Sequence, residues 1–201
     1  KEESIVFSTT NLEIYASASV ERDGIQGNLT FCVNGKKLEQ AIDNYNDGEL
    51  EIEPKIDKKR ITEITIKQGK KRHKFQNFAS DEFPMYDEFK PNDKCVLNIE
   101  MIEAMKSAIL CSCKDEFRYE MTGVHIDKTS IVGTDGYRMF EFVSDTPLLA
   151  KGITLPLSLS TLMVRLITDS CKVETDGNSI KVSTTGLTIV GKLVNEKFPN
   201  Y

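Results

Sequence analysis

The sequence predicts an α+β fold made of repeated units, each with one short strand, one helix and about three further strands. Three segments share this plan. In each, a short extended stretch leads into a polar residue at the expected start of a helix, and these residues are Asn34, Asn98 and Ser158. Their spacings of 64 and 60 residues set the size of the unit. After each helix, apolar and polar residues alternate as they do in half-buried strands.

The elements follow one another in a regular order along the chain. Residues 1–20 already alternate like strands, and apolar residues recur at helical spacing within 27–42, 94–109 and 151–166. The alternating runs predict strands at 50–56, 61–68 and 72–78 in the first unit, at 119–127, 130–136 and 137–144 in the second, and at 171–175, 179–184 and 187–194 in the third.

Helix caps and hairpin turns are predicted between these elements. The side-chain oxygen of the polar residue at each helix start can accept a hydrogen bond from a free amide of the first turn, so we expect all three to be helix caps. Turn signals between alternating runs predict hairpins at Gln68-Gly69, Asp127-Lys128 and Asp176-Gly177. Asp-Gly is the strongest of the three signals.

A longer repeat divides the chain into two domains. The sequence DEFPMY at 81–86 has a close relative in NEKFPNY at 195–201, and the two Phe-Pro pairs are 115 residues apart. A spacing of this size corresponds to a domain rather than to a solenoid repeat. We therefore expect one domain at 1–91 and a second domain at 92–201.

Composition limits the class of protein. The 201 residues carry a net charge of −5, and no apolar run approaches the ~20 residues that a bilayer span requires. The five cysteines lack paired metal-ligand spacing, which predicts reduced thiols in a cytoplasmic protein and no metal site. The sequence has no Gly-rich phosphate loop and predicts no cofactor. The negative charge excludes a protein that is basic all over, but one basic face could still bind nucleic acid.

Several motifs occur together in this chain: STTNLEI at 8–14, DEFPMY at 81–86, TDGYRMF at 134–140, GKLVNEKFPNY at 191–201, and the strand-helix units. In order and spacing they resemble the bacterial sliding clamp, the beta subunit of DNA polymerase III. The resemblance runs over nearly the whole chain. It implies a DNA-clamp fold, with helices on one face of antiparallel sheets.

The resemblance also implies a function. A family subunit has three similar domains, and two subunits close head to tail into a homodimeric ring around double-stranded DNA. By that pattern the chain lacks the first strand and helix of domain one and all of domain three. The expected role is a processivity factor that tethers the DNA polymerase III alpha subunit and the clamp loader, and that binds other clamp-binding peptides. A clamp catalyses no reaction, so we expect no enzyme activity.

Sliding requires attraction to phosphates without base readout, which Lys and Arg provide. The resemblance implies DNA-contacting residues at the start of the first helix and on or after the second. They are Lys36, Lys37, Lys106, Lys114, Arg118 and Tyr119. Each of the charged residues, taken singly, also fits an ordinary solvated charge. The family commonly has a basic pair where this chain has Leu157-Ser158, so we expect a less positive inner surface.

The second implied site is half of a pocket that receives short peptides with apolar anchors. Its residues would be Met121, Thr134, Gly136, Tyr137, Arg138 and Met139. Tyr137 stands where His is frequent in the family and Met139 where Leu is frequent, and both keep an apolar wall. The other half of the pocket belongs to the linker and the third domain, so we expect the chain alone to bind such peptides weakly. A simple Thr-Asp-Gly turn would explain the glycine but not the longer match through Met139.

Two other classes of function stay open. A clamp-like adaptor that binds protein partners without encircling DNA is suggested by the acidic balance and by Leu157-Ser158. An enzyme that uses Asp135, His125 or Asp176 has little support, because no recognisable motif places two of these residues together.

Overall fold

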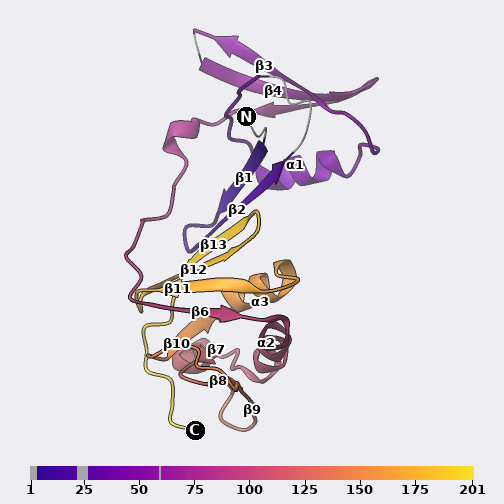
Figure 1. The fold of residues 1–201 in the computed structure, drawn as a ribbon. Helices are drawn as coiled ribbons and strands as arrows, with labels where there is room; N and C mark the ends of the chain where they lie inside the picture. The colour runs from indigo at the N-terminus through magenta and orange to yellow at the C-terminus, as the bar shows by residue number, and fades with distance from the viewer. Residues whose placement is uncertain (1–3, 22–26, 59) are drawn as a thin grey trace. The chain divides into compact units, whose positions relative to one another are not determined.

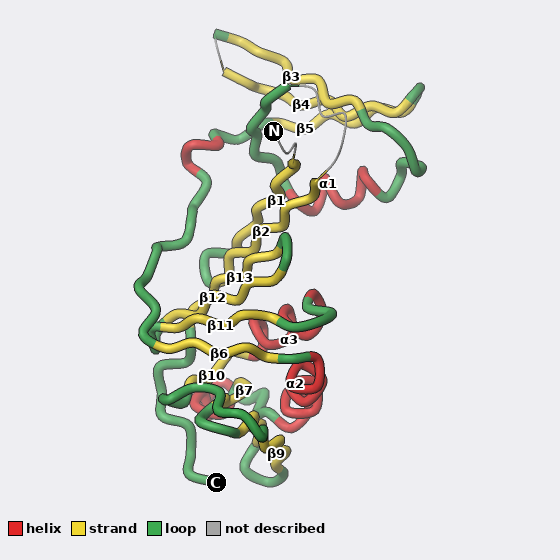
Figure 2. Tube along the Cα trace, in the orientation of Figure 1, coloured by secondary structure: helices red, strands yellow, loops and turns green. Residues whose placement is uncertain are grey.

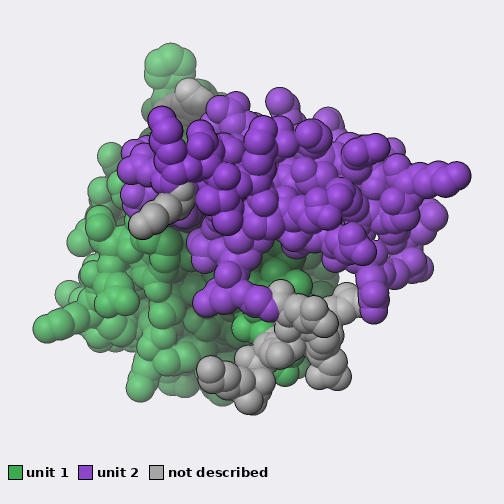
Figure 3. Space-filling view, turned by 90° about the horizontal axis from the view of Figure 1, so that it is seen from above, with its two compact units in different colours: residues 1–23, 85–201 green, residues 24–84 purple. Residues whose placement is uncertain are grey.

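The computed structural model describes residues 4–21, 27–58 and 60–201. The chain divides into two compact units, which are shown in different colours in Figure 3: a large unit of 1–23 and 85–201, and a small unit of 24–84. The helices and strands, labelled in Figure 1 and coloured by type in Figure 2, are β1 (Ser4–Thr10), β2 (Ile14–Glu21), α1 (Gly35–Ile42), β3 (Glu51–Asp57), β4 (Arg60–Gln68), β5 (Lys71–Gln76), η1 (Ser80–Glu82), β6 (Asp93–Leu97), α2 (Ile99–Cys111), η2 (Glu116–Met121), β7 (Gly123–Ile126), β8 (Ser130–Thr134), β9 (Met139–Val143), β10 (Ile153–Pro156), α3 (Leu157–Leu166), β11 (Cys171–Thr175), β12 (Ser179–Thr184) and β13 (Leu187–Lys192).

The large unit contains two antiparallel sheets and the helices α2 and α3. One sheet has six strands in the order β1-β2-β13-β12-β11-β6, and the other has four in the order β10-β7-β8-β9. Helix α2 packs against β7, β8 and β9, α3 packs against β7 and β10, and the two helices contact each other. The core includes Leu97 from the first sheet, Leu155 from the second and Met105 from α2, and all three are fully buried. The helices therefore share one core with both sheets.

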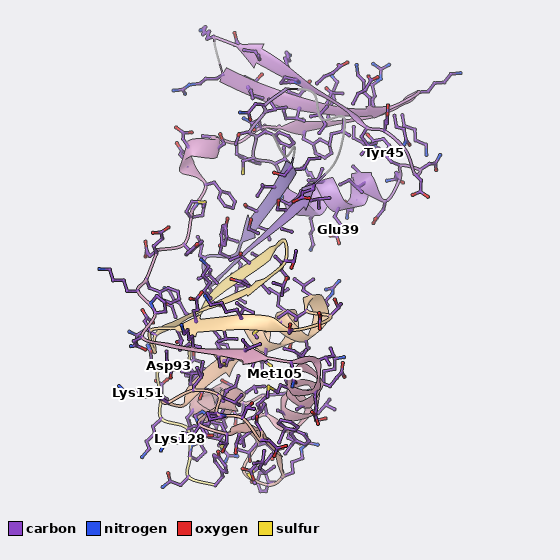
Figure 4. The ribbon with its side chains drawn as sticks, in the orientation of Figure 1. Glu39, Tyr45, Asp93, Met105, Lys128 and Lys151 are labelled. Atoms are coloured by element: carbon purple, nitrogen blue, oxygen red, sulfur yellow. The ribbon has the colours of Figure 1, made fainter. Side chains whose placement is uncertain are left out.

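The small unit is a three-stranded antiparallel sheet, β3-β4-β5, with α1 packed against it. Ala41 of α1, Ile64 and Ile66 of β4 and Phe75 of β5 form its core. Tyr45, labelled in Figure 4, follows α1, and its hydroxyl donates to the carbonyl oxygen of Ile66 at 2.6 Å. This hydrogen bond ties the end of the helix to the central strand.

Two of the three predicted helix caps are present. The side chain of Asn34 accepts from the amide of Lys37, and that of Asn98 accepts from the amide of Met101. The prediction for Ser158 was wrong, because α3 begins one residue earlier, after Pro156. The amide of Leu157, the first residue of α3, donates to the carbonyl oxygen of Thr122 at 3.2 Å, so a distant segment satisfies one amide of the first turn.

Removing the cap of α2 is expected to destabilise the large unit. Asn98→Ala leaves the amide of Met101 without its side-chain acceptor, and the expected loss is about 1 kcal/mol in the free energy of unfolding. Ser158→Ala is the matched control, because Ser158 is exposed and caps nothing, and it should change stability by less than about 0.5 kcal/mol. Equilibrium unfolding in urea measures both values. Equal losses in the two variants would contradict the assignment of the caps.

The strand pairing bears on the predicted domain boundary. Strand β2 pairs with β13, from Leu187 opposite Ala18 to Gly191 opposite Ile14, so that the six-stranded sheet draws on both ends of the chain. Residues 1–23 are for this reason compact with 85–201. The division into domains at 1–91 and 92–201 follows the sequence repeat rather than this compactness, and it stays a prediction.

Candidate functional site

The residues predicted to bind peptides gather at the hairpin between β8 and β9. Thr134 ends β8 and is buried, its hydroxyl donates to the carbonyl oxygen of Arg138 at 2.8 Å, and it accepts from the amide of Gly136 at 3.0 Å. Gly136 has a φ of +84°, a conformation that side chains with a Cβ rarely adopt. The chain reverses direction here because these local hydrogen bonds and the glycine together close a tight turn.

Asp135 holds the other side of this turn. One carboxylate oxygen accepts from the amides of Tyr137 and Arg138, both at 3.0 Å, and the other accepts from Nε of Arg138 at 3.0 Å. The amide of Arg138, the amide of Tyr137 and then the Arg138 side chain lower the pKa of Asp135. The Asp135 carboxylate therefore stabilises the turn, which is a structural role rather than a catalytic one.

A second Thr-Asp-Gly turn between β11 and β12 has the same geometry. The hydroxyl of Thr175 donates to the carbonyl oxygen of Ser179 at 2.7 Å and accepts from the amide of Gly177 at 3.0 Å. Asp176 accepts from the amides of Asn178 and Ser179, both at 2.8 Å, and Gly177 has a φ of +94°. The chain therefore forms this local Thr-Asp-Gly turn twice. Only the side chains around the first turn can set the predicted peptide site apart from the second turn.

Arg118 is the side chain that distinguishes the first turn. Its Nη1 donates to the carbonyl oxygen of Asp135 at 2.7 Å, and its Nη2 lies 3.7 Å from the sulfur of Met121. The guanidinium carbon is 6.0 Å from the centre of the Tyr137 ring, within reach of a cation–π interaction. We predicted Arg118 as a DNA contact, whereas the structure places its guanidinium against the predicted peptide site.

The predicted site has one buried apolar residue, Met121, and an exposed apolar rim formed by Tyr137 and Met139. Met121 is buried at the end of η2, while Tyr137 is 94% exposed and Met139 is 48% exposed. The residues 119–121 were predicted as the start of a strand, and this part of the prediction was wrong. They form the 3-10 helix η2 because the side chain of Asp115 caps its first turn by accepting from the amide of Phe117. The structure therefore brings together all six predicted peptide-binding residues, and Arg118 with them.

The residues predicted to contact DNA lie in both units. Lys36 and Lys37 are exposed in the first turn of α1, in the small unit. Lys106, Lys114 and Tyr119 are exposed on or after α2, in the large unit. Lys106 is ion-paired with Glu103, and α3 has Arg165 as its one basic residue. With Glu100, Glu103 and Lys106 on α2 and Arg165 on α3, the two helices together carry no net charge.

His125, which was open as a catalytic candidate, has a packing role. Its ring stacks on that of Phe198 with centroids 4.3 Å apart, and its Nδ1 lies 3.0 Å from the hydroxyl of Thr154. Burial lowers the pKa of His125, and the charge of Asp127 opposes this in part. The hydroxyl of Tyr201 donates to Asp127 at 3.0 Å. The second Phe-Pro-x-Tyr segment, 198–201, thus packs against β7 through Phe198 and is hydrogen-bonded to the residue after β7 through Tyr201.

The buried histidine predicts a pH dependence. Folding lowers the pKa of His125, so as the pH falls below the ordinary histidine value of 6.5 the unfolded chain binds a proton more readily than the folded protein, and the free energy of unfolding should fall. His125→Phe keeps an aromatic ring next to Phe198 and removes the titration, and the other histidine, His73, is common to both proteins. Urea unfolding at several pH values should show that acidification lowers the free energy of unfolding more steeply in the wild type than in His125→Phe. An equal pH dependence in the two proteins would contradict the assignment of this effect to His125.

The described residues hold few other groups suited to chemistry. Within them, no group of three or more His, Cys, Asp or Glu side chains is placed to hold a metal ion. Burial raises the pKa of Cys95 to about 12 and that of Cys171 to about 11, so both thiols are protonated and weakly nucleophilic at neutral pH. No helix in the described ranges is long and apolar enough to cross a membrane.

Comparisons with known proteins agree with the resemblance read from the motifs. No protein-family model matches the chain. In sequence it is similar to the beta sliding clamp of Helicobacter pylori (strain J99), with 24% identity over 207 residues that cover 96% of this chain and 53% of that protein. The chain thus spans about half the length of this curated relative.

Solved structures confirm the predicted α+β clamp fold. The Helicobacter pylori beta clamp bound to a DNA ligase peptide is similar to this chain with a TM-score of 0.83 and 19% identity, over 100% of this chain and 58% of that one. The DNA polymerase III beta subunit of Thermotoga maritima gives a TM-score of 0.80 and 22% identity, over 100% of this chain and 56% of that one. The antiparallel sheets and three helices expected from the repeats therefore have counterparts in these proteins.

Proposed function

We propose that this chain, which has the fold of DNA polymerase III beta clamps over its whole length, is part of a DNA sliding clamp that keeps a replicative polymerase on duplex DNA. The observation that carries the proposal is that, within this fold, five of the six predicted peptide-binding residues lie at one hairpin, and the sixth, Met121, contacts Arg118 beside it. In this proposal, residues 1–91 and 92–201 are two clamp domains joined by the pairing of β2 with β13. The complete protein would form a homodimeric ring.

The proposed partners are short peptides of replication proteins. The rim side chains Tyr137 and Met139 would receive the apolar anchors of such a peptide, and buried Met121 would form the floor. The Helicobacter pylori clamp has been solved bound to a DNA ligase peptide, which supports this class of partner. We extend it to the DNA polymerase III alpha subunit and to the clamp loader, which would compete for the same hairpin.

The proposed DNA contacts are weak and independent of sequence. Lys36, Lys37, Lys106 and Lys114 would attract phosphates, and Tyr119 would contact the duplex next to Lys114. The clamp would catalyse no reaction and would act in the cytoplasm. With few basic residues on α2 and α3, retention on DNA would depend on the closed ring more than on charge.

A topological assay tests the proposal. The complete gene product is loaded onto nicked circular DNA by its clamp loader, half of the sample is cut once to make the DNA linear, and the protein that stays bound is measured by gel filtration at physiological salt. Retention on circles and loss from linear DNA is the expected result. Equal retention on both forms would contradict encirclement, because sliding off an end requires only that the ends be free.

The runner-up function is a clamp-like adaptor that binds protein partners without encircling DNA. It is favoured by the neutral start of α3 at Leu157 and Ser158, and by the two acidic residues, Glu100 and Glu103, that accompany Lys106 on α2. An adaptor should bind a DNA ligase peptide and yet remain off both circular and linear DNA. The same assay, with peptide binding measured in parallel, separates the two functions.

A further inference from the structure

We propose that the large unit has a second site for partner proteins, a hollow between residues 86–91 and the strands β11 and β12 that receives an arginine side chain. This hollow is separate from the hairpin at 134–138. Its relation to that hairpin follows from a repeated turn and rests on the proposed function, whereas the hollow and its lining are features of the chain itself.

A third turn with the hydrogen bonds of the two Thr-Asp-Gly turns joins β1 to β2. The hydroxyl of Thr10 donates to the carbonyl oxygen of Ile14 at 3.0 Å and accepts from the amide of Leu12 at 3.0 Å. The side-chain oxygen of Asn11 accepts from the two amides after Leu12, at 3.1 and 2.7 Å. Leu12 takes the place of the glycine, with a φ of +75°. Thr10 and Thr134 are 124 residues apart, so the β1–β2 and β8–β9 hairpins are counterparts in the repeat.

The residue of this hairpin that corresponds to Met139 is covered. Thr134 pairs with Met139 across the β8–β9 hairpin, and Thr10 pairs in the same way with Tyr15 across the β1–β2 hairpin. Met139 is 48% exposed, whereas Tyr15 is 6% exposed and its ring lies against that of Tyr86, with the centroids 5.0 Å apart. At this hairpin, the chain's own tyrosine therefore covers the position whose counterpart we expect to meet a partner peptide.

Beyond Tyr86, the segment that leads into β6 (Figure 1) borders a hollow on the outer face of the six-stranded sheet. Glu174 of β11 and Lys181 of β12 are direct cross-strand partners, so both side chains lie on the face opposite to the buried Val173 and Val182. The hollow has a volume of about 240 Å³. This is below the range of about 300–1,000 Å³ that is usual for small-molecule pockets, and it suits a single side chain. The lining consists of Tyr86, Glu88, Phe89, Pro91, Glu174 and Lys181.

One side of the hollow is aromatic and carries a carboxylate without an ionic partner. Tyr86 and Phe89 are half-buried, and Pro91 adjoins them in the lining. Glu88 is exposed and forms no ion pair within the part of the chain that the structure describes. A carboxylate beside aromatic rings favours a cation that can stack on a ring and form an ion pair at the same time.

The opposite side of the hollow holds charges that already have neighbours of opposite sign. Glu174 is ion-paired with Lys172, with Oε1 and Nζ 2.7 Å apart, and Lys181 lies opposite Glu174 in the strand register. Two lysines thus neighbour Glu174, whereas Glu88 has no cation of its own among the described residues. An incoming cation would therefore find its partner at Glu88, and Lys181 would repel a second positive charge.

Arginine suits this lining better than other side chains do. Its planar guanidinium can stack on the aromatic rings and pair with both oxygens of Glu88, while its aliphatic stem packs against Pro91. A lysine offers a point charge with no plane to stack, and an apolar side chain would leave Glu88 unused. The predicted site at the β8–β9 hairpin, which presents apolar side chains, should therefore prefer a different segment of a partner.

Ligand-detected NMR with the complete protein tests the arginine directly, and it suits the weak binding expected of one anchored side chain. The probe is a short peptide of glycine and serine with one central arginine. The same peptide with citrulline, which has nearly the same shape but no charge, is its control. We expect the citrulline peptide to bind about tenfold more weakly.

Matched variants locate the binding. Glu88→Gln should weaken binding of the arginine peptide by about tenfold, and Phe89→Leu, which keeps an apolar side chain but removes the ring, by about threefold. Asp87→Asn is the control, because Asp87 is exposed, carries the same charge one residue away and does not line the hollow. It should change the affinity by less than about twofold.

The DNA ligase peptide of the Helicobacter pylori complex separates this site from the proposed peptide site. Glu88→Gln should leave the affinity for the ligase peptide unchanged, and Gly136→Val should leave the affinity for the arginine peptide unchanged. If the ligase peptide does not bind the wild type, the proposed function loses its support. The comparison of arginine with citrulline then still decides whether the hollow binds a guanidinium group.

Two outcomes would overturn the proposal. Equal affinity for the arginine and citrulline peptides, or no binding of either, would show that the hollow does not recognise the guanidinium charge. Equal losses in Glu88→Gln and Asp87→Asn would show that binding follows the overall charge of the segment and not the lining of the hollow.

Discussion

Alanine in place of Gly133 is expected to lower the free energy of unfolding of the large unit by about 3 kcal/mol. Gly133 lies in β8 where α2 crosses the strand, and a Cβ on it would lie 2.0 Å from the carbonyl oxygen of Ala108 and 2.6 Å from the carbonyl carbon. These are backbone atoms that no side-chain rotation can move. The helix would have to shift away from the sheet, which would open the core around Met105 and Ile131.

Urea unfolding followed by circular dichroism measures this loss. Gly177→Ala is the control, because Gly177 has a φ of +94° but open space around it, so that only backbone strain of about 1 kcal/mol is expected. The steric contribution is the difference between the losses in the free energy of unfolding of the two variants. If Gly133→Ala cost no more than Gly177→Ala, the packing of α2 on β8 would have to be far looser than the structure describes.

Valine in place of Gly136 is expected to weaken peptide binding by about tenfold or more. A β-branched residue is strained at a φ of +84°, and its Cβ would lie 2.3 Å from the Arg118 guanidinium. Relief of both strains would move the turn and displace the arginine, so that the contact between the Arg118 guanidinium and the Tyr137 ring would be lost. Isothermal titration calorimetry of the DNA ligase peptide with the complete protein measures the loss of affinity.

A matched variant in the second turn isolates the cause. Gly177→Val imposes similar backbone strain at the β11–β12 hairpin, where the six predicted peptide-binding residues are absent. We expect it to reduce stability as Gly136→Val does and to leave peptide affinity unchanged. Equal losses of affinity in both variants would indicate a general loss of folded protein, and the hairpin at 134–138 would no longer be the preferred site.

Much of the fold could be predicted because its signals are local. Helical spacing and alternation need only neighbouring residues, so the predictions of three helices and of hairpins at Gly69, Asp127 and Gly177 are confirmed. The caps at Asn34 and Asn98 also act within four residues. The prediction failed at Ser158, because α3 begins earlier, at Leu157, whose amide donates to the carbonyl oxygen of the distant Thr122.

The candidate site divides in the same way. The sequence by itself determined the Thr-Asp-Gly turns, because each is closed by hydrogen bonds among five consecutive residues, and the chain forms the turn twice. Only the tertiary structure decided that Arg118 lies under one turn and not the other, and that β2 completes the sheet of β13. Both depend on segments that are far apart in the sequence and meet only when the core has formed, so no pattern within a short window could reveal them.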